Sequence, residues 1–409
     1  MKRCWIHIGM HKTSSTSVQR NLQKITGPSN WKLLDVGGRP NMGPALREMF
    51  SEDSTNGLLV ASVDQTLEVV ARNGELWREE LRKVIESLSG EVCIISGELL
   101  SDPTFCTKSI NAFHLFLLPY FDEIRVFGYV RPPRQYKNSR FQQKLKHNLS
   151  RFDLNSVKLN YHSRFSKFDD VFGSSNVFLR KFDPATFPNQ CAVTDFCQQI
   201  GIQLPGNSVI RKYNESLSRN ACAILFAYRK FGPGYGVGLN AKKENTQLIR
   251  ALELMGGSKF GLSQSIIDPE IALEREDIIW MERRIGASLE DEVLDGGFEA
   301  TCEEDLLRIS ASSCAEFLSS FEKLNRVCVY PQFETESNPV DPMEVARLVQ
   351  SCRLISRQIL RQKKGFRLER TEKNPLRRKK TTLAIVAGRF AKFVRLKLTG
   401  FCRCQFFSF

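Results

Sequence analysis

The sequence has no uncharged apolar run of the roughly 18 or more residues that a membrane-spanning helix needs. Its twelve cysteines include no C-x-x-C pair, and only Cys402 and Cys404 lie close together. Scattered cysteines predict neither a zinc site nor a disulfide framework, and they indicate a reducing compartment. The first residues reach charged and hydroxyl side chains within about ten positions, too early for a signal peptide. We therefore expect a cytoplasmic protein that is soluble or at most attached to a surface.

Acidic residues are scarce in the last part of the chain. The 409 residues carry a net charge of +14, and residues 361–409 contain 15 Lys and Arg against 2 Asp and Glu. The rest of the chain is nearly balanced, so the basic charge belongs to the tail. Because no recognised nucleic-acid-binding motif accompanies it, we expect no nucleic acid partner. The composition, 42% hydrophobic and 25% charged, is ordinary for a globular protein.

Within this tail, residues 376–397 combine apolar and basic side chains at roughly helical spacing. A basic amphipathic helix with aromatic residues suits an anionic membrane surface. Three interpretations stay open: a contact with such a membrane surface, a site for an anionic polysaccharide, and a solvated extension.

The first half of the chain alternates short apolar runs with helical patterns. The apolar runs predict strands, and the segments between them carry helical periodicity. The expected strands are residues 4–8, 91–96, 124–130 and 176–182, and the expected helices among them begin near 17 and cover 65–87 and 110–118. This alternation predicts an α/β fold with a mainly parallel sheet, in which ligands bind at the carboxyl ends of the strands.

From about residue 190 the pattern becomes predominantly helical. The glycine-rich segment GPGYGVG, residues 232–238, follows a helical pattern, so we interpret it as a connector and not as a nucleotide loop. The helices are expected at 191–200, 216–230, 241–255, 269–287, 303–324 and 341–362. We predict an α/β domain over residues 1–295, a helical extension over 296–365, and a basic amphipathic or disordered tail over 366–409.

The first expected strand runs into IHIGMHKTSSTSVQRNL, residues 6–22. A strand, a tight turn and a helix together make an anion site, because the helix N-terminus offers unpaired N–H groups and the positive end of its dipole. Lys12 adds a full positive charge, and the hydroxyls of Thr13, Ser14, Ser15 and Thr16 can donate to phosphate or sulfate oxygens. A lysine followed by hydroxyls also describes an ordinary helix N-cap, so the motif by itself leaves both interpretations open.

This turn does not match the Walker A pattern, because Gly9 precedes Lys12 by three residues and there is no second glycine. It resembles the 5′-phosphosulfate loop of sulfotransferases that use 3′-phosphoadenosine 5′-phosphosulfate (PAPS), which often reads G-x-H-K-T-G-T-T. Ser14 stands where that family usually has glycine, and Ser15 where it usually has threonine. Ser14 thus places a side chain where the backbone normally approaches the ligand.

A second motif, YVRPPRQYKNSRFQQKLK at residues 129–146, follows the third of the expected strands listed above. Arginine offers a bidentate fork for a phosphate dianion, and serine adds a short donor. Arg131 at the strand end and Ser139 eight residues later are similar in spacing to the sulfotransferase residues that hold the 3′-phosphate of PAPS. Alone, each could be a surface residue of ordinary kind, but together they favour the sulfotransferase resemblance.

Weaker resemblances to bacterial, carbohydrate-sulfotransferase-like proteins occur at residues 172–187, 193–205, 213–218 and 278–289. Glu98, after the second of these strands, resembles the glutamate that deprotonates the acceptor hydroxyl in several carbohydrate sulfotransferases. A helix-capping or ion-paired carboxylate is the equally weighted alternative. His11 is the other candidate base, whereas strand periodicity predicts that His7 packs in the core.

The resemblance implies a P-loop-NTPase-like sheet and a PAPS-dependent sulfotransferase that requires no metal. Lys12 and the four hydroxyls would hold the phosphosulfate, Arg131 and Ser139 the 3′-phosphate, and Glu98 would take the acceptor proton. The acceptor is expected to be a carbohydrate or glycolipid. Two alternatives stay open: a degenerate sulfotransferase fold that binds an anionic partner, and a P-loop nucleotide kinase, for which the sequence offers no clear Mg²⁺-binding carboxylate.

Overall fold

The computed structural model describes residues 1–10, 12–25, 30–51, 67–88, 92–206, 208–211, 213, 216–236, 241–291, 299–327 and 341–372. The chain forms two compact units of interleaved segments. The first, which we call the sheet unit, contains residues 1–141, 153–215 and 264–294, and the second, the helical unit, contains 142–152, 216–263 and 295–409. Because the segments interleave, the units do not test where a boundary along the chain would fall, and the predicted domain limits stay predictions.

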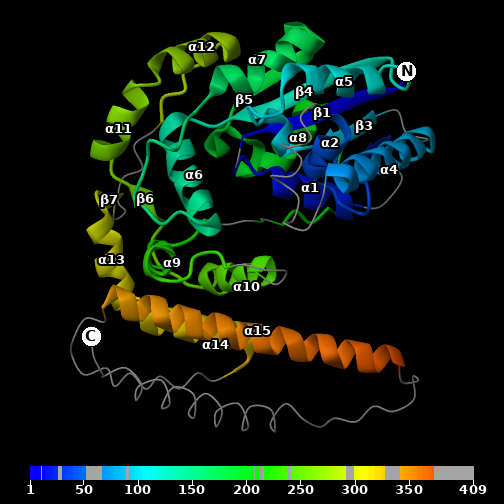
Figure 1. Ribbon diagram of the computed structural model, residues 1–409. Helices are drawn as coiled ribbons and strands as arrows, with labels where there is room; N and C mark the ends of the chain where they lie inside the picture. Colours follow the sequence, from blue (N-terminus) through cyan, green and yellow to red (C-terminus); the bar gives the residue numbers. More distant parts are fainter. Residues whose placement is uncertain are drawn as a thin grey trace. The chain divides into compact units, whose positions relative to one another are not determined.

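The sheet unit is built on five parallel strands in the order β2-β3-β1-β4-β5. Figure 1 labels β1, β3, β4 and β5 of this sheet. Their bounds are β1 Arg3–Gly9, β2 Trp31–Leu33, β3 Val92–Ser96, β4 Glu123–Val130 and β5 Val177–Lys181. Since every paired strand is parallel, all carboxyl ends lie at one edge. With helices on both faces of this sheet and a helical C-terminal region, the predicted α/β fold class is confirmed.

Helices and short 3₁₀ turns connect these strands. The α-helices of the sheet unit are α1 Ser15–Lys24, α2 Gly43–Phe50, α4 Leu67–Glu86, α5 Thr107–Leu117, α6 Pro133–His147, α7 Tyr161–Phe172, α8 Ala192–Gln199, α11 Gln264–Ala272 and α12 Arg275–Ile285. The 3₁₀ turns are η1 Glu98–Ser101, η2 Ser174–Asn176, η3 Pro184–Thr186 and η4 Pro188–Gln190. The C-terminal part of α6, from residue 142, belongs to the helical unit.

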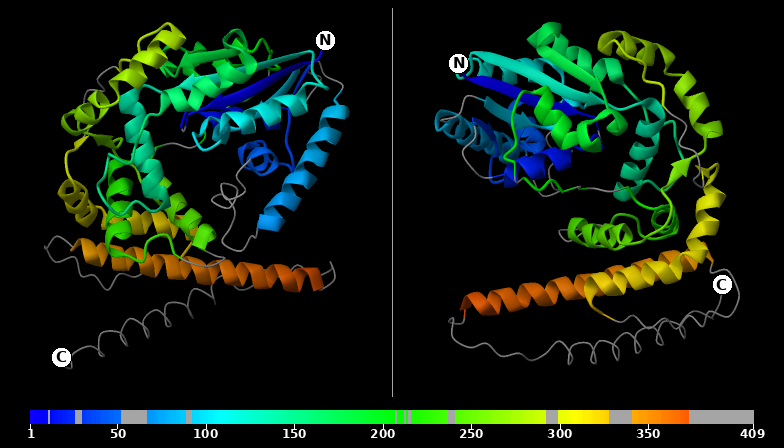
Figure 2. Two further views of the ribbon diagram at one scale, coloured as in Figure 1. Left: turned by 45° about the horizontal axis from the view of Figure 1, so that its top comes forward. Right: turned by 180° about the vertical axis from the view of Figure 1, so that it is seen from behind.

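Both faces of the sheet are buried, which is usual for parallel strands between helical layers. Side chains of β1 alternate, so that Ile6 packs in the cluster that includes α2, α5 and α7. Trp5 points the other way and packs in a second cluster with Val18 of α1 and Phe196 of α8. Further views show helices on either side of the strands (Figure 2). The central strand β1 is therefore held from both faces, and so is the loop at its carboxyl end.

The helical unit contains α9 Arg219–Phe231, α10 Ala241–Glu253, α13 Glu303–Ser312, α14 Cys314–Asn325 and α15 Pro342–Glu372, with a short parallel pair of β6 Gly261–Leu262 and β7 Glu299–Ala300. The described part of the glycine-rich segment, residues 232–236, follows helix α9 as predicted. Two buried arginines, Arg229 and Arg353, each donate to the carbonyl of Gly234 at 3.0 Å. This segment is thus a connector held in place by the helices around it.

Among the described residues, no helix combines the length and the apolar character needed to cross a lipid bilayer.

Candidate functional site

The loop between β1 and α1 turns back tightly on the end of the strand. A Cβ added at Gly9 would lie 2.9 Å from Thr13 Oγ1, so glycine is required for this close approach. Thr13 is fully buried and its hydroxyl donates to the carbonyl of Met10 at 2.8 Å. The Thr13 hydroxyl therefore stabilises the loop itself. His11 lies outside the described residues.

Two residues of this loop adopt left-handed backbone conformations, Lys12 with φ 66° and Ser14 with φ 61°. The position at which the resemblance expects glycine thus has the backbone conformation that favours glycine. Ser14 is the N-cap residue of α1 but makes no side-chain cap hydrogen bond. Its hydroxyl leaves the first N–H groups of α1 without the usual side-chain acceptor.

The remaining hydroxyls of the run differ in exposure. Ser15 is buried, at 3% exposure, and its Oγ has no hydrogen-bond partner among the described residues. Lys12, Ser14 and Thr16 are partly exposed. Among the described residues, the Ser15 hydroxyl is thus a buried donor without a partner at the N-terminus of α1. An anion at this place could accept hydrogen bonds from that hydroxyl and from the first N–H groups of the helix.

Arg131 follows the last residue of β4 and reaches the loop. Its Nη1 donates to the carbonyl oxygen of Lys12 at 2.7 Å, and its backbone N–H lies 3.4 Å from Met10 Sδ. Tyr161 donates to the carbonyl of Arg131 at 2.6 Å, and the guanidinium lies over the Phe182 ring at 5.9 Å. Burial lowers the pKa of Arg131 to about 10, so the side chain stays charged at neutral pH. The structure thus brings together the two sequence motifs.

Ser139 lies on α6, six residues beyond Pro133, the first residue of that helix. At 1.5 Å per residue this is about 9 Å along the helix axis. Its side chain is largely buried, at 9% exposure. In the described part of the chain, Arg131 and Ser139 share no hydrogen bond. Both residues lie on the segment that runs from the end of β4 into α6.

Glu98 begins η1 directly after β3 and is partly exposed. The backbone N–H of Gly97 donates to the carbonyl of His7 at 3.0 Å, which extends the sheet pairing to this point. Ser101 then donates to the carbonyl of Gly9 at 2.6 Å. Glu98 therefore begins a turn that is bonded directly to the end of β1, on the side opposite β4.

His7 is buried on the face of the sheet that packs on α1 and α8. Its Nδ1 lies 2.8 Å from Ser96 Oγ, and Gln19 Nε2 donates to the same hydroxyl at 2.9 Å. The ring contacts Phe196, with 4.6 Å between centroids. Burial lowers the pKa of His7 to about 3, so the imidazole is neutral at physiological pH. This is the packed core histidine that the strand periodicity predicts.

Two buried basic side chains hold the segment that follows Glu98. Lys167 Nζ donates to the carbonyls of Asp102 and Phe105, each at 2.7 Å. Arg164 Nη1 donates to the carbonyl of Ser101 at 3.4 Å, and its Nη2 donates to Tyr136 Oη at 2.9 Å. Burial lowers the pKa of Lys167 to about 7. These contacts were not predicted, because Arg164 and Lys167 lie on helix α7, for which no helix was expected from the sequence.

Asp291 is a further residue near the site that sequence analysis missed. Its Oδ2 accepts from the backbone N–H groups of Arg134 and Gln135, at 2.7 and 3.3 Å, at the start of α6. Burial raises the pKa of Asp291 above its usual range, against those N–H contacts. It contributes an electrostatic interaction with Arg131. No local pattern marks it, since it is more than 150 positions along the chain from its partners.

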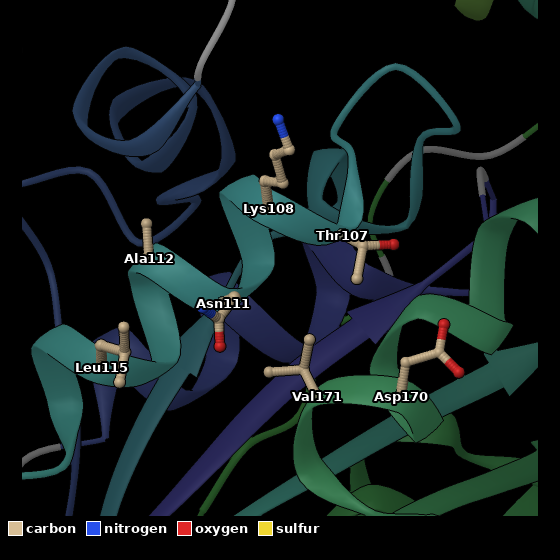
Figure 3. Close-up of a pocket in the computed structure, with 7 residues that line it drawn as sticks. All are labelled: Thr107, Lys108, Asn111, Ala112, Leu115, Asp170 and Val171. Carbon is tan, nitrogen blue, oxygen red and sulfur yellow. The ribbon is translucent and has the colours of Figure 1, made fainter.

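A groove of about 440 Å³ lies elsewhere on the sheet unit, between α5 and α7 (Figure 3). The residues that line it are Thr107, Lys108, Asn111, Ala112, Leu115, Asp170 and Val171. None of the predicted site residues is among them. In the described ranges of the chain, three or more His, Cys, Asp or Glu side chains gather nowhere in a way that could hold a metal ion.

No family model matches the chain, and no curated protein matches its sequence. Among solved structures, a sulfotransferase from Alicyclobacillus acidocaldarius is similar with a TM-score of 0.31 and 14% sequence identity. The match covers 56% of this chain and 93% of that protein. Similarity at this level does not place the chain in a family.

Proposed function

We propose that this chain is a sulfotransferase that moves the sulfuryl group of PAPS to a hydroxyl of an acceptor. The observation that carries the proposal is the 2.7 Å hydrogen bond from Arg131 Nη1 to the carbonyl of Lys12. It joins two motifs about 120 residues apart at the carboxyl edge of one parallel sheet, where ligands of α/β folds bind.

The chemistry of the loop fits a doubly anionic group. Helix α1 has ten residues, no side-chain cap at its N-terminus and no acidic residue in its first turn. Ser15 Oγ is buried there without a partner among the described residues. Helix N–H groups, a hydroxyl and the charge of Lys12 together favour a phosphate or sulfonate.

In this proposal PAPS supplies a sulfuryl group attached to a phosphate leaving group. Lys12 stabilises the charge that develops on the bridging oxygen as the S–O bond breaks. Thr13 and Ser14 of the loop, with Ser15 and Thr16 at the start of α1, orient the phosphosulfate. As the acceptor oxygen bonds to sulfur, its proton passes to a base. The product 3′,5′-adenosine diphosphate then leaves.

Glu98 is the proposed base, because it is partly exposed at the end of β3, beside the end of β1. His11 stays the alternative. Arg131 and Ser139 are proposed to bind the 3′-phosphate, Arg131 through its charged guanidinium and Ser139 through its hydroxyl. In this arrangement Lys12 supplies positive charge at the phosphosulfate, and Arg131 supplies it at the 3′-phosphate.

We also propose that the acceptor is a carbohydrate or a glycolipid, that the protein is cytoplasmic, and that residues 376–397 contact an anionic membrane surface. The first two rest on the sequence resemblance and the cysteine pattern. The third rests on the basic amphipathic pattern of a segment that lies outside the described residues.

Calorimetric titration with 3′,5′-adenosine diphosphate, ADP and ATP with Mg²⁺ tests the function. We expect selective binding of the 3′,5′-nucleotide and a 10- to 100-fold loss in Lys12→Ala and Arg131→Ala, because a hydrogen bond to a charged group contributes about 1.5–3 kcal/mol. Arg134→Ala is the matched control, since its guanidinium binds Asp268 at 2.8 Å. Glu98→Gln should keep nucleotide affinity while transfer falls about 10²-fold or more.

The alternatives give different results in the same titration. Preference for ATP with Mg²⁺ would indicate a nucleotide kinase. Absence of binding to all three nucleotides by the folded protein would indicate a degenerate fold that binds another anionic partner.

A further inference from the structure

Asp291 occupies the N-terminus of helix α6, the position at which a helix can bind an anion. Its Oδ2 accepts from the backbone N–H groups of Arg134 and Gln135, at 2.7 and 3.3 Å. The side chain is nine-tenths buried, and its Oδ1 has no hydrogen-bond partner among the described residues. A carboxylate supplied from far along the chain thus takes the N–H groups that follow Arg131.

Asp291 also acts on Arg131 through its charge. The two side chains make no direct ion pair in the described structure, yet the carboxylate raises the pKa of the guanidinium against the effect of burial. Arg131 Nε, like Asp291 Oδ1, is buried without a hydrogen-bond partner among the described residues. Tyr161 is the third group that interacts with this pair, through its hydroxyl on the Arg131 carbonyl. The carboxylate therefore favours the charged form of the guanidinium before any ligand binds.

The guanidinium of Arg134, also at the start of α6, is paired with another carboxylate. The side chain of Arg134 forms a two-armed contact with Asp268, at 2.8 and 2.9 Å, and that carboxylate is 44% exposed. Asp268 and Asp291 thus lie at the same helix end but differ in partner and burial. Asp268 forms an ion pair with Arg134, whereas Asp291 interacts electrostatically with Arg131.

We propose that Asp291 is a positioning residue that holds the start of α6 and limits the affinity of Arg131 for the 3′-phosphate of the nucleotide. This inference rests on the proposed function. A carboxylate bonded to the N–H of Arg134, three residues beyond the phosphate-binding arginine, repels a dianion held there, and the repulsion is strong where both charges are shielded from water. A product with a 3′-phosphate then leaves more readily than it would from Arg131 alone.

Asparagine at this position separates the two roles. The Asp291→Asn side chain keeps an oxygen that can accept from the α6 N–H groups but carries no charge. Asp291→Ala removes both the acceptor and the charge. Asp268→Asn is the matched control, because it removes a neighbouring carboxylate that does not act on Arg131.

The test is calorimetric titration of the full chain and the three variants with 3′,5′-adenosine diphosphate and with 5′-AMP, which lacks the 3′-phosphate. We expect Asp291→Asn to bind 3′,5′-adenosine diphosphate about tenfold more tightly, with 5′-AMP and Asp268→Asn unchanged within about twofold. Asp291→Ala should lower the melting temperature, because α6 loses its cap. Equal or weaker binding of 3′,5′-adenosine diphosphate by folded Asp291→Asn would overturn the proposal.

Titration with inorganic sulfate separates this inference from the proposed function. If the wild-type protein binds neither nucleotide but Asp291→Asn binds sulfate more tightly than wild type, the proposed function fails and the role of Asp291 at Arg131 stands. If nucleotides bind as expected and Asp291→Asn changes neither affinity, the function stands and the role of Asp291 fails. If the wild-type protein binds neither nucleotide and Asp291→Asn binds sulfate no more tightly than wild type, both proposals are overturned.

Discussion

Replacing Ser14 with glycine tests the backbone geometry of the loop after β1. Ser14 has φ 61° and ψ 16°, in the left-handed region, and makes no side-chain cap hydrogen bond. That conformation costs a residue other than glycine about 1–2 kcal/mol. The greater freedom of glycine in the unfolded chain offsets about 0.4–1 kcal/mol of the relief. We therefore expect Ser14→Gly to raise the free energy of unfolding by about 0.8 kcal/mol, within a range of about 0 to 1.6 kcal/mol.

Ser14→Ala is the control, because alanine keeps the β-carbon and its strain but lacks the hydroxyl. Since that hydroxyl makes no cap hydrogen bond, we expect a change within about 0.5 kcal/mol. If Ser14 were an ordinary N-cap in solution, alanine would cost about 0.5–2 kcal/mol and glycine a few tenths. If both variants have a lower free energy of unfolding than the wild type, and alanine costs more than glycine, the left-handed geometry of Ser14 is refuted.

Tryptophan fluorescence in urea is the appropriate assay. All four tryptophans of the chain, Trp5, Trp31, Trp77 and Trp280, belong to the sheet unit. Trp5 and Trp31 are buried in the cluster that packs on α1, the helix that Ser14 begins. The signal therefore reports unfolding of the unit that carries the substitution.

Three further predictions use the same assay. Gly9→Ala should lower the free energy of unfolding by about 1–3 kcal/mol, because the added Cβ would lie 2.9 Å from Thr13 Oγ1, whereas Gly206→Ala, with nothing within 4 Å, should be nearly neutral. Burial lowers the pKa of His7 from 6.5 to about 3, so the unfolded chain binds the proton first and stability falls as the pH drops below 6.5. The loss sums to about 1.4 kcal/mol between pH 7.5 and 5.5 and approaches about 1.4 kcal/mol per pH unit below that range. His7→Gln should remove this loss, so an unchanged pH dependence would contradict the buried neutral histidine. Asp277→Ala should cost about 0.5–2 kcal/mol, because its carboxylate accepts from the N–H groups of Tyr161 and His162 and so caps helix α7, and an unchanged midpoint would contradict that role.

The fold class could be predicted because buried parallel strands are continuous apolar runs. Strands β1, β3, β4 and β5 lie within one or two residues of their expected positions. Strand β2, Trp31–Leu33, was missed because three residues are too short to show a period. The expected long helices at 269–287 and 303–324 are each two helices, broken near residues 273 and 313. Periodicity detects a helical region but not a turn of one or two residues within it.

Helix α7 was missed for a different reason, which is how it begins. Asn160, its N-cap residue, is left-handed and makes no side-chain cap hydrogen bond. The first N–H groups, those of Tyr161 and His162, instead donate to the carboxylate of Asp277 at 2.6 and 2.8 Å. A cap that comes from more than 100 residues away leaves no local signal. The same is true of Asp291 at the start of α6.

The sequence placed Lys12, Glu98 and Arg131 at strand ends, and parallel pairing brings those ends to one edge. It could not show how neighbouring hydroxyls differ. Thr13 Oγ1 is bonded to the Met10 carbonyl inside the loop, whereas Ser15 Oγ is buried without a partner among the described residues. Where each hydroxyl points depends on the left-handed backbone of Lys12 and Ser14. That backbone is held by a contact from far along the chain, the bond from Arg131 to the Lys12 carbonyl.

The loop geometry bears on the alternative that these hydroxyls form an ordinary helix N-cap. An N-cap serine has an extended backbone and accepts an N–H bond with its side chain, but Ser14 does neither. Lys12 and Ser14 are both left-handed, at a cost of order 1–3 kcal/mol each, and such conformations persist only where surrounding contacts over-determine them. Here the contacts are the Thr13 bond to Met10 and the Arg131 bond to the Lys12 carbonyl. The backbone of Ser14 and its missing cap bond therefore argue against an ordinary N-cap, and the anion site of the proposed function stays the interpretation to test.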